Sequence, residues 1–216
     1  MTIIKKLLLV TILIAGCFLA SCSFKQEAKS PIEKIHEKFT AMDSYACIAD
    51  LTYISNKGEN TYKTKQYYKM TGEYRMEIIA PENLQGLTTV YDGEKVMQYN
   101  PRLLGEVVNE IPQSKTINEI FLGVFLKNYF QSEEVALEVF SSNYEDYTVL
   151  EAVIPEGGKY LSTEKLWISN NSLNPTKLVI YDEDRKERII VEYHEFKYNV
   201  NLDESVFKIN KSNSGQ

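Results

Sequence analysis

The chain has 216 residues, of which 44% are hydrophobic and 25% charged, a balance typical of one globular domain rather than of a disordered segment. Its formal net charge is −6, and no basic run is longer than the short segment 184–188. This charge argues against nucleic-acid binding and against electrostatic adhesion to anionic lipid, so attachment to a membrane would require an anchor.

The N-terminal residues have the layout of an export signal. Lys5 and Lys6 precede the unbroken apolar segment 7–14, and charge returns only at Lys25. The apolar run is shorter than the roughly 20 residues that a transmembrane helix needs. The sequence therefore predicts export from the cytoplasm by a signal that is removed.

The end of this signal resembles a bacterial lipobox. Segment 19–22 reads Leu-Ala-Ser-Cys, so cleavage between Ser21 and Cys22 would free an amine on a cysteine whose thiol carries diacylglycerol. Segment 14–17 fits the same pattern, but cleavage there would shorten the apolar core. We predict lipidation at Cys22 and localisation on the extracytoplasmic face of a membrane. Lipidation at Cys17, an ordinary cleaved signal and an uncleaved anchor are the alternatives.

These features divide the chain into four predicted parts. Residues 1–21 are the signal peptide, and 22–30 are the lipidated cysteine with a polar tether. Residues 31–210 form a single domain, and the polar residues 211–216 are expected to be disordered.

The first half of the domain is expected to begin with a helix and to continue as strands. Apolar residues recur at spacings of three and four in 31–42, which predicts an amphipathic helix whose buried side holds Ile32, Ile35, Phe39 and Met42. From Tyr45 the period changes to two, which predicts strands at 45–53, 59–70 and 73–80. The Asn-Lys-Gly segment 56–58 indicates a tight turn. Asp92-Gly93 between two apolar runs indicates a hairpin.

Residues 101–116 are expected to form a loop, and 117–130 a helix capped by Thr116. The apolar residues of this helix cover most of its circumference, so it should be buried on several sides or cover something. The candidate residues that line a concavity or face a partner are Ile120, Phe121, Val124, Phe125, Tyr129 and, on a later strand, Trp167. For the single tryptophan, a position in the sheet core is favoured over the concavity.

The rest of the chain is expected to form strands near 135–140, 147–154, 160–169, 176–181 and 188–198. So many consecutive antiparallel strands must curl or close. The sequence therefore predicts a mainly β (α+β) fold, a curved antiparallel half-barrel of about 10–11 strands with helices on its concave side.

Residues with catalytic or metal-binding chemistry are few. His36 and His194 share no ligand spacing, and Cys47 is the only cysteine after the predicted lipid site. Cys47 alternates with apolar residues, which favours a small buried side chain over an intermolecular disulfide. The sequence has no nucleophile elbow, phosphate loop or zinc-protease motif. We therefore expect no catalytic residue, no metal and no cofactor.

Two segments resemble the LolA/LolB/RseB-like lipoprotein superfamily. Residues 72–101 are similar to its strand–loop–hairpin core. Residues 166–209 are similar to its C-terminal half, with a Trp strand, a Pro-x-x-Leu entry and a closing Asn-x-x-Leu-x-x-x-x-Phe. The resemblance implies a curved half-barrel with helices inside, and binding of lipoprotein acyl chains in the concavity. A predicted anchor at Cys22 departs from the pattern of a soluble carrier.

Within this superfamily the chain resembles germination lipoproteins of the GerS type from spore-forming clostridia. That resemblance implies a non-enzymatic protein of spore or forespore membranes, which binds and activates an N-acetylmuramoyl-L-alanine amidase that modifies the spore cortex. It supplies no catalytic residues. The hypotheses are therefore an anchored protein-interaction module with an amidase partner, a binder of lipid or acyl chains, and an enzyme. A strand-exchanged homodimer is compatible with the sequence but not required by it.

Overall fold

The computed structural model divides the chain into two compact units, residues 1–30 and 31–216. The described residues are 29–103, 108–112, 118–132, 136–142, 145–155 and 157–209. The predicted signal, the lipid site at Cys22 and most of the tether lie outside them, as does the tail 211–216. Every helix and strand described below belongs to the second unit.

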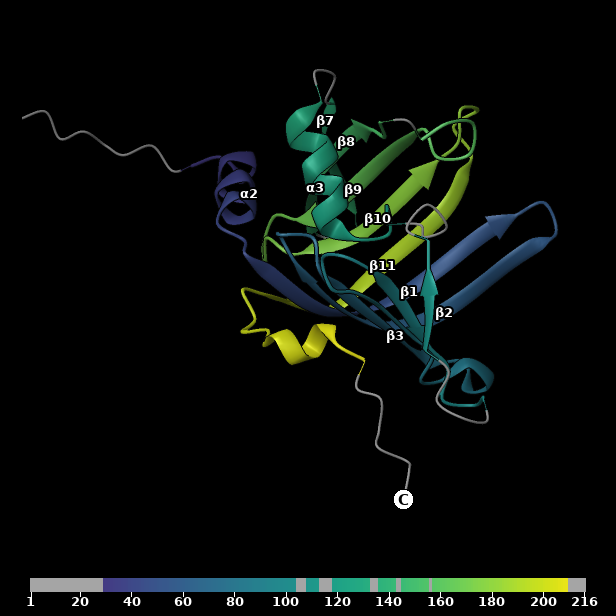
Figure 1. The fold of residues 1–216 in the computed structure, drawn as a ribbon. Helices are drawn as coiled ribbons and strands as arrows, with labels where there is room; N and C mark the ends of the chain where they lie inside the picture. Colours follow the sequence, from purple (N-terminus) through teal and green to yellow (C-terminus); the bar gives the residue numbers. More distant parts are fainter. Residues whose placement is uncertain are drawn as a thin grey trace, which may run out of the picture. The chain divides into compact units, whose positions relative to one another are not determined.

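Eleven strands of the described residues form one antiparallel sheet, in the order β6-β5-β4-β3-β2-β1-β11-β10-β9-β8-β7 (Figure 1). The strands are β1 (Ser44–Ser55), β2 (Gly58–Lys69), β3 (Tyr74–Ala80), β4 (Thr88–Tyr91), β5 (Val96–Tyr99), β6 (Val108–Ile111), β7 (Ala136–Ser142), β8 (Glu145–Val153), β9 (Thr163–Ser169), β10 (Pro175–Tyr181) and β11 (Glu187–Tyr198). β6 and β7 are the two edges, so the sheet is open. The predicted fold class is confirmed.

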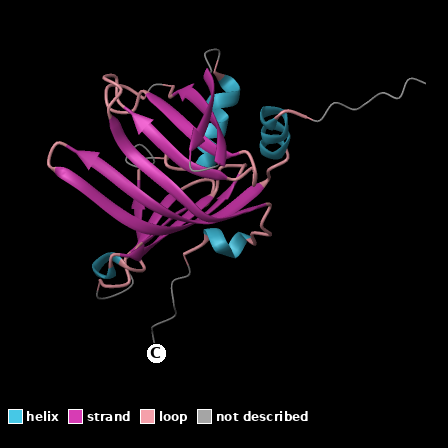
Figure 2. Cartoon of the chain, turned by 180° about the vertical axis from the view of Figure 1, so that it is seen from behind, coloured by secondary structure: helices cyan, strands magenta, loops and turns pink. Residues whose placement is uncertain are grey.

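The helical elements of the described residues are few and short. They are the α-helices α2 (Pro31–Thr40) and α3 (Leu122–Gln131) and the 3-10 turns η1 (Glu82–Leu84) and η3 (Glu204–Phe207), seen from behind in Figure 2. Within the described ranges, no helix has the length and apolar character needed to cross a bilayer. We call the face of the sheet that packs against α3 the inner face, and the opposite face the outer face.

The predicted periods identify the buried positions in the first half. Ile35, Phe39 and Met42 at and after α2 are buried, and so are Tyr45, Cys47, Ala49 and Leu51 on alternate positions of β1. The tight turn is present between β1 and β2, where Gly58 has a φ of +126° that favours glycine. The hairpin between β4 and β5 is also present, and Asp92 accepts hydrogen bonds from the backbone N–H groups of Glu94 and Lys95.

Two sequence predictions need correction. Part of the expected loop 101–116 is the strand β6, which pairs with β5. Its four residues are too few to show a period. The predicted helix 117–130 begins only at Leu122, and the expected cap Thr116 lies outside the described residues. The first N–H groups of a helix have no partner within the helix. At Leu122 this N–H donates to the Tyr45 hydroxyl of β1 at 3.2 Å.

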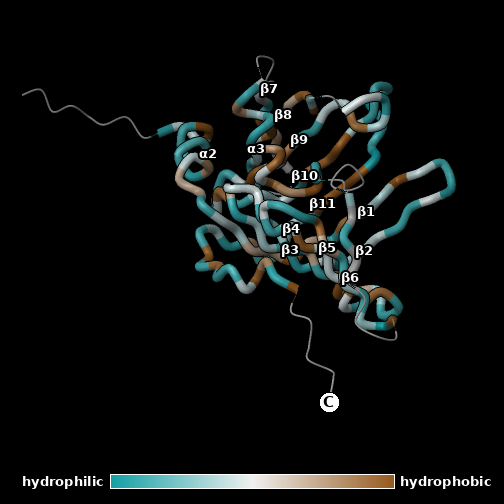
Figure 3. The backbone as a smooth tube through the Cα atoms, in the orientation of Figure 1, coloured by the Kyte–Doolittle hydropathy of each residue, from teal (hydrophilic) through white to brown (hydrophobic). Residues whose placement is uncertain are grey.

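The core lies between α3 and the inner face. Its buried hydrophobic residues come from both halves of the sheet, such as Leu51 of β1, Leu178 of β10 and Val191 of β11, and Figure 3 shows brown segments along β10 and β11. The Phe121 ring stacks on Tyr74 with centroids 4.4 Å apart. A Cβ added at Gly123 would lie 2.0 Å from the Tyr68 ring, so this glycine lets the α3 backbone approach β2 closely.

Candidate functional site

Four of the five candidate residues at α3 are buried in the core. Ile120, Phe121, Phe125 and Tyr129 are at most 7% exposed, while Val124 is partly buried against the same cluster. The Tyr129 hydroxyl lies 3.0 Å from His36 Nε2, which links α3 to α2. These side chains therefore fill one half of the concavity and do not line an open space there.

Trp167 lies on the outer face, away from α3. Its neighbours Leu166 and Ile168 are fully buried in the core, so alternation along β9 turns Trp167 to the other side. Lys177 Nζ lies 5.5 Å from the centre of the indole ring. Trp167 is therefore a residue neither of the concavity nor of the buried core, and its role toward a partner stays a prediction.

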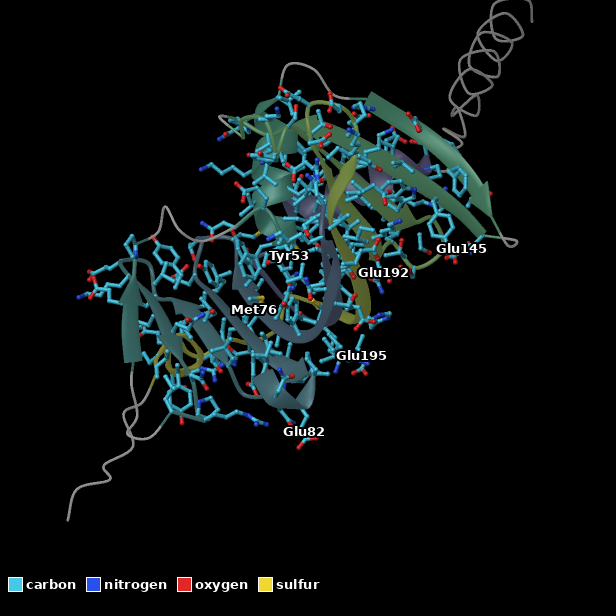
Figure 4. The ribbon with its side chains drawn as sticks, turned by 90° about the vertical axis from the view of Figure 1, so that its right-hand side faces the viewer. Tyr53, Met76, Glu82, Glu145, Glu192 and Glu195 are labelled. Atoms are coloured by element: carbon cyan, nitrogen blue, oxygen red, sulfur yellow. The ribbon has the colours of Figure 1, made fainter. Side chains whose placement is uncertain are left out.

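The other half of the inner face contains a pocket of about 330 Å³, which we call the inner pocket. It is lined by Leu51, Tyr53, Asn60, Tyr62, Thr64, Met76, Ile78, Leu84, Leu87, Thr89 and Gln98. Figure 4 labels Tyr53 of β1 and Met76 of β3. Burial and the neighbouring Tyr62 raise the pKa of Tyr53 to about 12, as expected for an apolar environment. The volume of the inner pocket is at the lower end of the range for small-molecule sites.

The edge strand β7 exposes apolar side chains. Val139 is 71% exposed and Phe140 is 51% exposed, on the two sides of a strand that pairs only with β8 among the described residues. Such an edge presents unpaired N–H and C=O groups that another chain can bind. Here apolar side chains flank this edge.

The histidines and Cys47 do not form a common site. His194 Nε2 lies 2.9 Å from Asp50 Oδ2 on the exposed side of the sheet. His36 pairs instead with Tyr129, so the two histidines share no partner. The Cys47 thiol is free and buried, and desolvation raises its pKa well above the ordinary value. In the described part of the chain, no three His, Cys, Asp or Glu side chains gather as metal ligands would.

A buried carboxyl group on β9 was missed by the sequence interpretation. Glu164 is fully buried, and its Oε1 accepts a hydrogen bond from Asn128 Nδ2 of α3 at 2.8 Å. Its Oε2 has no hydrogen-bond partner among the described residues. Burial raises the pKa of Glu164 to about 8. The signal was present in the sequence, because Glu164 alternates with Leu166 and Ile168 on a buried face.

The inner pocket was also missed as a specific site. Alternation assigns Tyr53, Tyr62 and Met76 to one face of their strands, but the uncovered part of this face depends on where α3 packs. No local pattern gives that position.

Among solved structures, one chain in the structure of the CwlD amidase from Clostridioides difficile in complex with the GerS lipoprotein is 31% identical to this chain. The match covers 80% of this chain and 99% of that one, with a TM-score of 0.49. The LolA superfamily protein NE2245 from Nitrosomonas europaea is 14% identical, over 84% of this chain and 99% of that one, with a TM-score of 0.45.

Sequence comparison gives the family. "Sporulation protein YdcC" of Bacillus subtilis (strain 168) is 22% identical over 205 residues, which are 95% of this chain and 60% of that protein. The chain thus spans about 60% of the length of this curated relative. The family model described as "Sporulation protein YdcC-like" matches residues 3–207. The chain belongs to the sporulation protein YdcC-like family.

Proposed function

We propose that this chain is a non-enzymatic, membrane-anchored lipoprotein that binds and activates a cell-wall N-acetylmuramoyl-L-alanine amidase during sporulation or germination. Membership of the sporulation protein YdcC-like family links the chain to sporulation. Cys22 would supply the anchor, and the resemblance of the chain to GerS-type lipoproteins suggests the amidase as partner.

The observation that carries the proposal is the exposed apolar edge at β7. A partner strand that pairs with β7 would gain main-chain hydrogen bonds and would cover Val139 and Phe140, one on each side of the sheet. The described residues therefore offer a binding surface there.

Affinity capture from sporulating cells tests this proposal. The chain is expected to retain a cell-wall amidase, and Val139→Lys should abolish retention because it puts a charge on the pairing edge. Val153→Lys is the matched control, since Val153 is also exposed, at 44%, but lies on β8. Capture of no amidase by the unmodified chain would reject the proposal. Equal loss in both variants would reject β7 as the docking edge.

A second candidate function is the binding of lipid or lipoprotein acyl chains. The observation that favours it is the inner pocket, where Tyr53, Met76 and Leu84 provide an apolar lining. Purified protein should then release lipid on solvent extraction, detected by mass spectrometry. Met76→Lys should remove this lipid because it places a charge in the lining. A lipid-free protein from native membranes would rule this function out.

A further inference from the structure

The last described segment of the chain packs on the outer face, across the sheet from α3 (Figures 1 and 2). Phe207 of η3 is 3% exposed, and Lys69 Nζ lies 5.0 Å from the centre of its ring. Arg75 Nη1 donates to the Val206 carbonyl at 3.5 Å. The segment therefore adds a wall to a sheet face that would otherwise be bare.

A hollow of about 730 Å³ lies between this wall and the strands, and we call it the C-terminal hollow. It is lined by Tyr67, Arg75, Glu77, Thr88, Tyr99, Val200, Asn201, Leu202, Ser205, Val206, Lys208 and Ile209. Its volume lies well within the range of small-molecule sites, and it is more than twice that of the inner pocket.

The strand register determines which residues are neighbours on the floor of the hollow. Tyr67 of β2 is paired with Arg75 of β3. Two positions further along β3 on the same outer face, Glu77 is paired with Thr88 of β4, which is paired with Tyr99 of β5. Neighbouring strands are about 4.8 Å apart, so the strands of Tyr67 and Tyr99 are about 14 Å apart. Two aromatic residues therefore bracket a polar floor.

Arg75 is the group in the lining that can bind an anionic ligand. Lys208 and the carboxylate of Glu77 also line the hollow, and Lys208 Nζ is paired with Glu204 at 3.5 Å. Among the described residues, Arg75 makes only the 3.5 Å bond to Val206 and a 3.9 Å ion pair with Glu77, although a guanidinium has five donors. Its remaining donors can bind a carboxylate through two parallel hydrogen bonds.

We propose that the C-terminal hollow binds a carboxylate-bearing saccharide, with the carboxylate on Arg75 and the sugar rings against Tyr67 and Tyr99. A sugar ring has an apolar C–H face that suits an aromatic side chain. Its hydroxyl edge suits polar groups, here those of Thr88, Asn201 and Ser205. A small inorganic anion would use Arg75 but leave both tyrosines without a role.

Calorimetric titration of the full chain in detergent tests this site with two disaccharides. The acidic probe is N-acetylglucosaminyl-N-acetylmuramic acid, and the neutral probe is N,N′-diacetylchitobiose. The acidic probe should bind about tenfold or more tightly than the neutral one, because a hydrogen-bonded charge contributes about 1.5–3 kcal/mol. Arg75→Gln should remove this preference. Lys57→Gln removes the same charge in the β1–β2 turn and should leave binding unchanged.

Further variants keep the test decisive if Arg75→Gln does not fold. Tyr99→Ala should weaken both probes. A chain ending at Ile209 should bind as the full chain does. Equal binding of the two probes, competition by inorganic phosphate as strong as by the acidic probe, or binding only after truncation would each overturn the proposal. Amidase capture by Arg75→Gln should persist, so failure of this site is distinguishable from failure of the proposed function.

Discussion

The burial of the Glu164 carboxyl group predicts how the stability of the fold changes with pH. It lies under α3, with Asn128 as hydrogen-bond donor to one oxygen and no partner for the other among the described residues. Burial is the main cause that raises its pKa from 4.5 to about 8, and the charge of Glu119 adds to it. The folded protein therefore holds this proton at pH values at which the unfolded chain has lost it.

The sign and size follow from linkage. Between pH 4.5 and 8 the folded state binds one more proton than the unfolded state, so the stabilising contribution is complete below pH 4.5 and is lost as pH rises to 8. The full effect is about 5 kcal/mol, of which about 4 kcal/mol falls between pH 5 and pH 9. Above pH 9 this group causes little further loss.

Urea unfolding of the wild-type chain and Glu164→Gln at pH 5, 7 and 9 measures this effect. Gln keeps an oxygen for Asn128 but cannot ionise. The free energy of unfolding of the wild type, taken relative to Glu164→Gln, should fall by about 4 kcal/mol from pH 5 to pH 9. Glu192→Gln, an exposed change on β11, should show no such trend against the wild type. A flat or rising difference for Glu164→Gln would refute the burial argument.

Three further predictions concern packing and attachment. Gly123→Ala should lower the free energy of unfolding by about 1–3 kcal/mol, because the new methyl group would meet the Tyr68 ring; an unchanged urea midpoint would contradict the close approach of α3. Cys47 in the domain without the first 30 residues should react with a maleimide only in urea, and rapid labelling in native buffer would contradict its burial. Incorporation of a palmitate analogue should be lost in Cys22→Ala and kept in Cys17→Ala; label that survives in Cys22→Ala would contradict the lipid site.

The repeating periods of the sequence predicted most of the fold. In β1 the alternation from Tyr45 to Leu51 identifies every buried side chain of the inner face, because a strand with one packed face has a strict period of two. In β2 the same face holds Thr64 and Gln66, which are fully buried despite their polarity. Thr64 Oγ1 donates to the Ala49 carbonyl at 3.0 Å, so burial there depends on a partner from another strand.

The features that escaped prediction depend on contacts between distant segments. β6 exists because its four residues pair with β5, and α3 begins at Leu122 where the Tyr45 hydroxyl accepts its N–H. The inner pocket is the part of the inner face that α3 does not cover. The C-terminal hollow requires the chain to return across strands more than 100 residues earlier, as in the Arg75–Val206 contact.

The function proposed for this chain is that of an anchored activator of a cell-wall amidase, with β7 as its docking edge. The most direct measurement is the rate of peptide release from purified cell wall by that amidase, alone and with the unmodified chain, Val139→Lys or Val153→Lys. We expect faster release with the unmodified chain and with Val153→Lys, and no acceleration with Val139→Lys. An amidase whose rate is the same with and without the unmodified chain would contradict it.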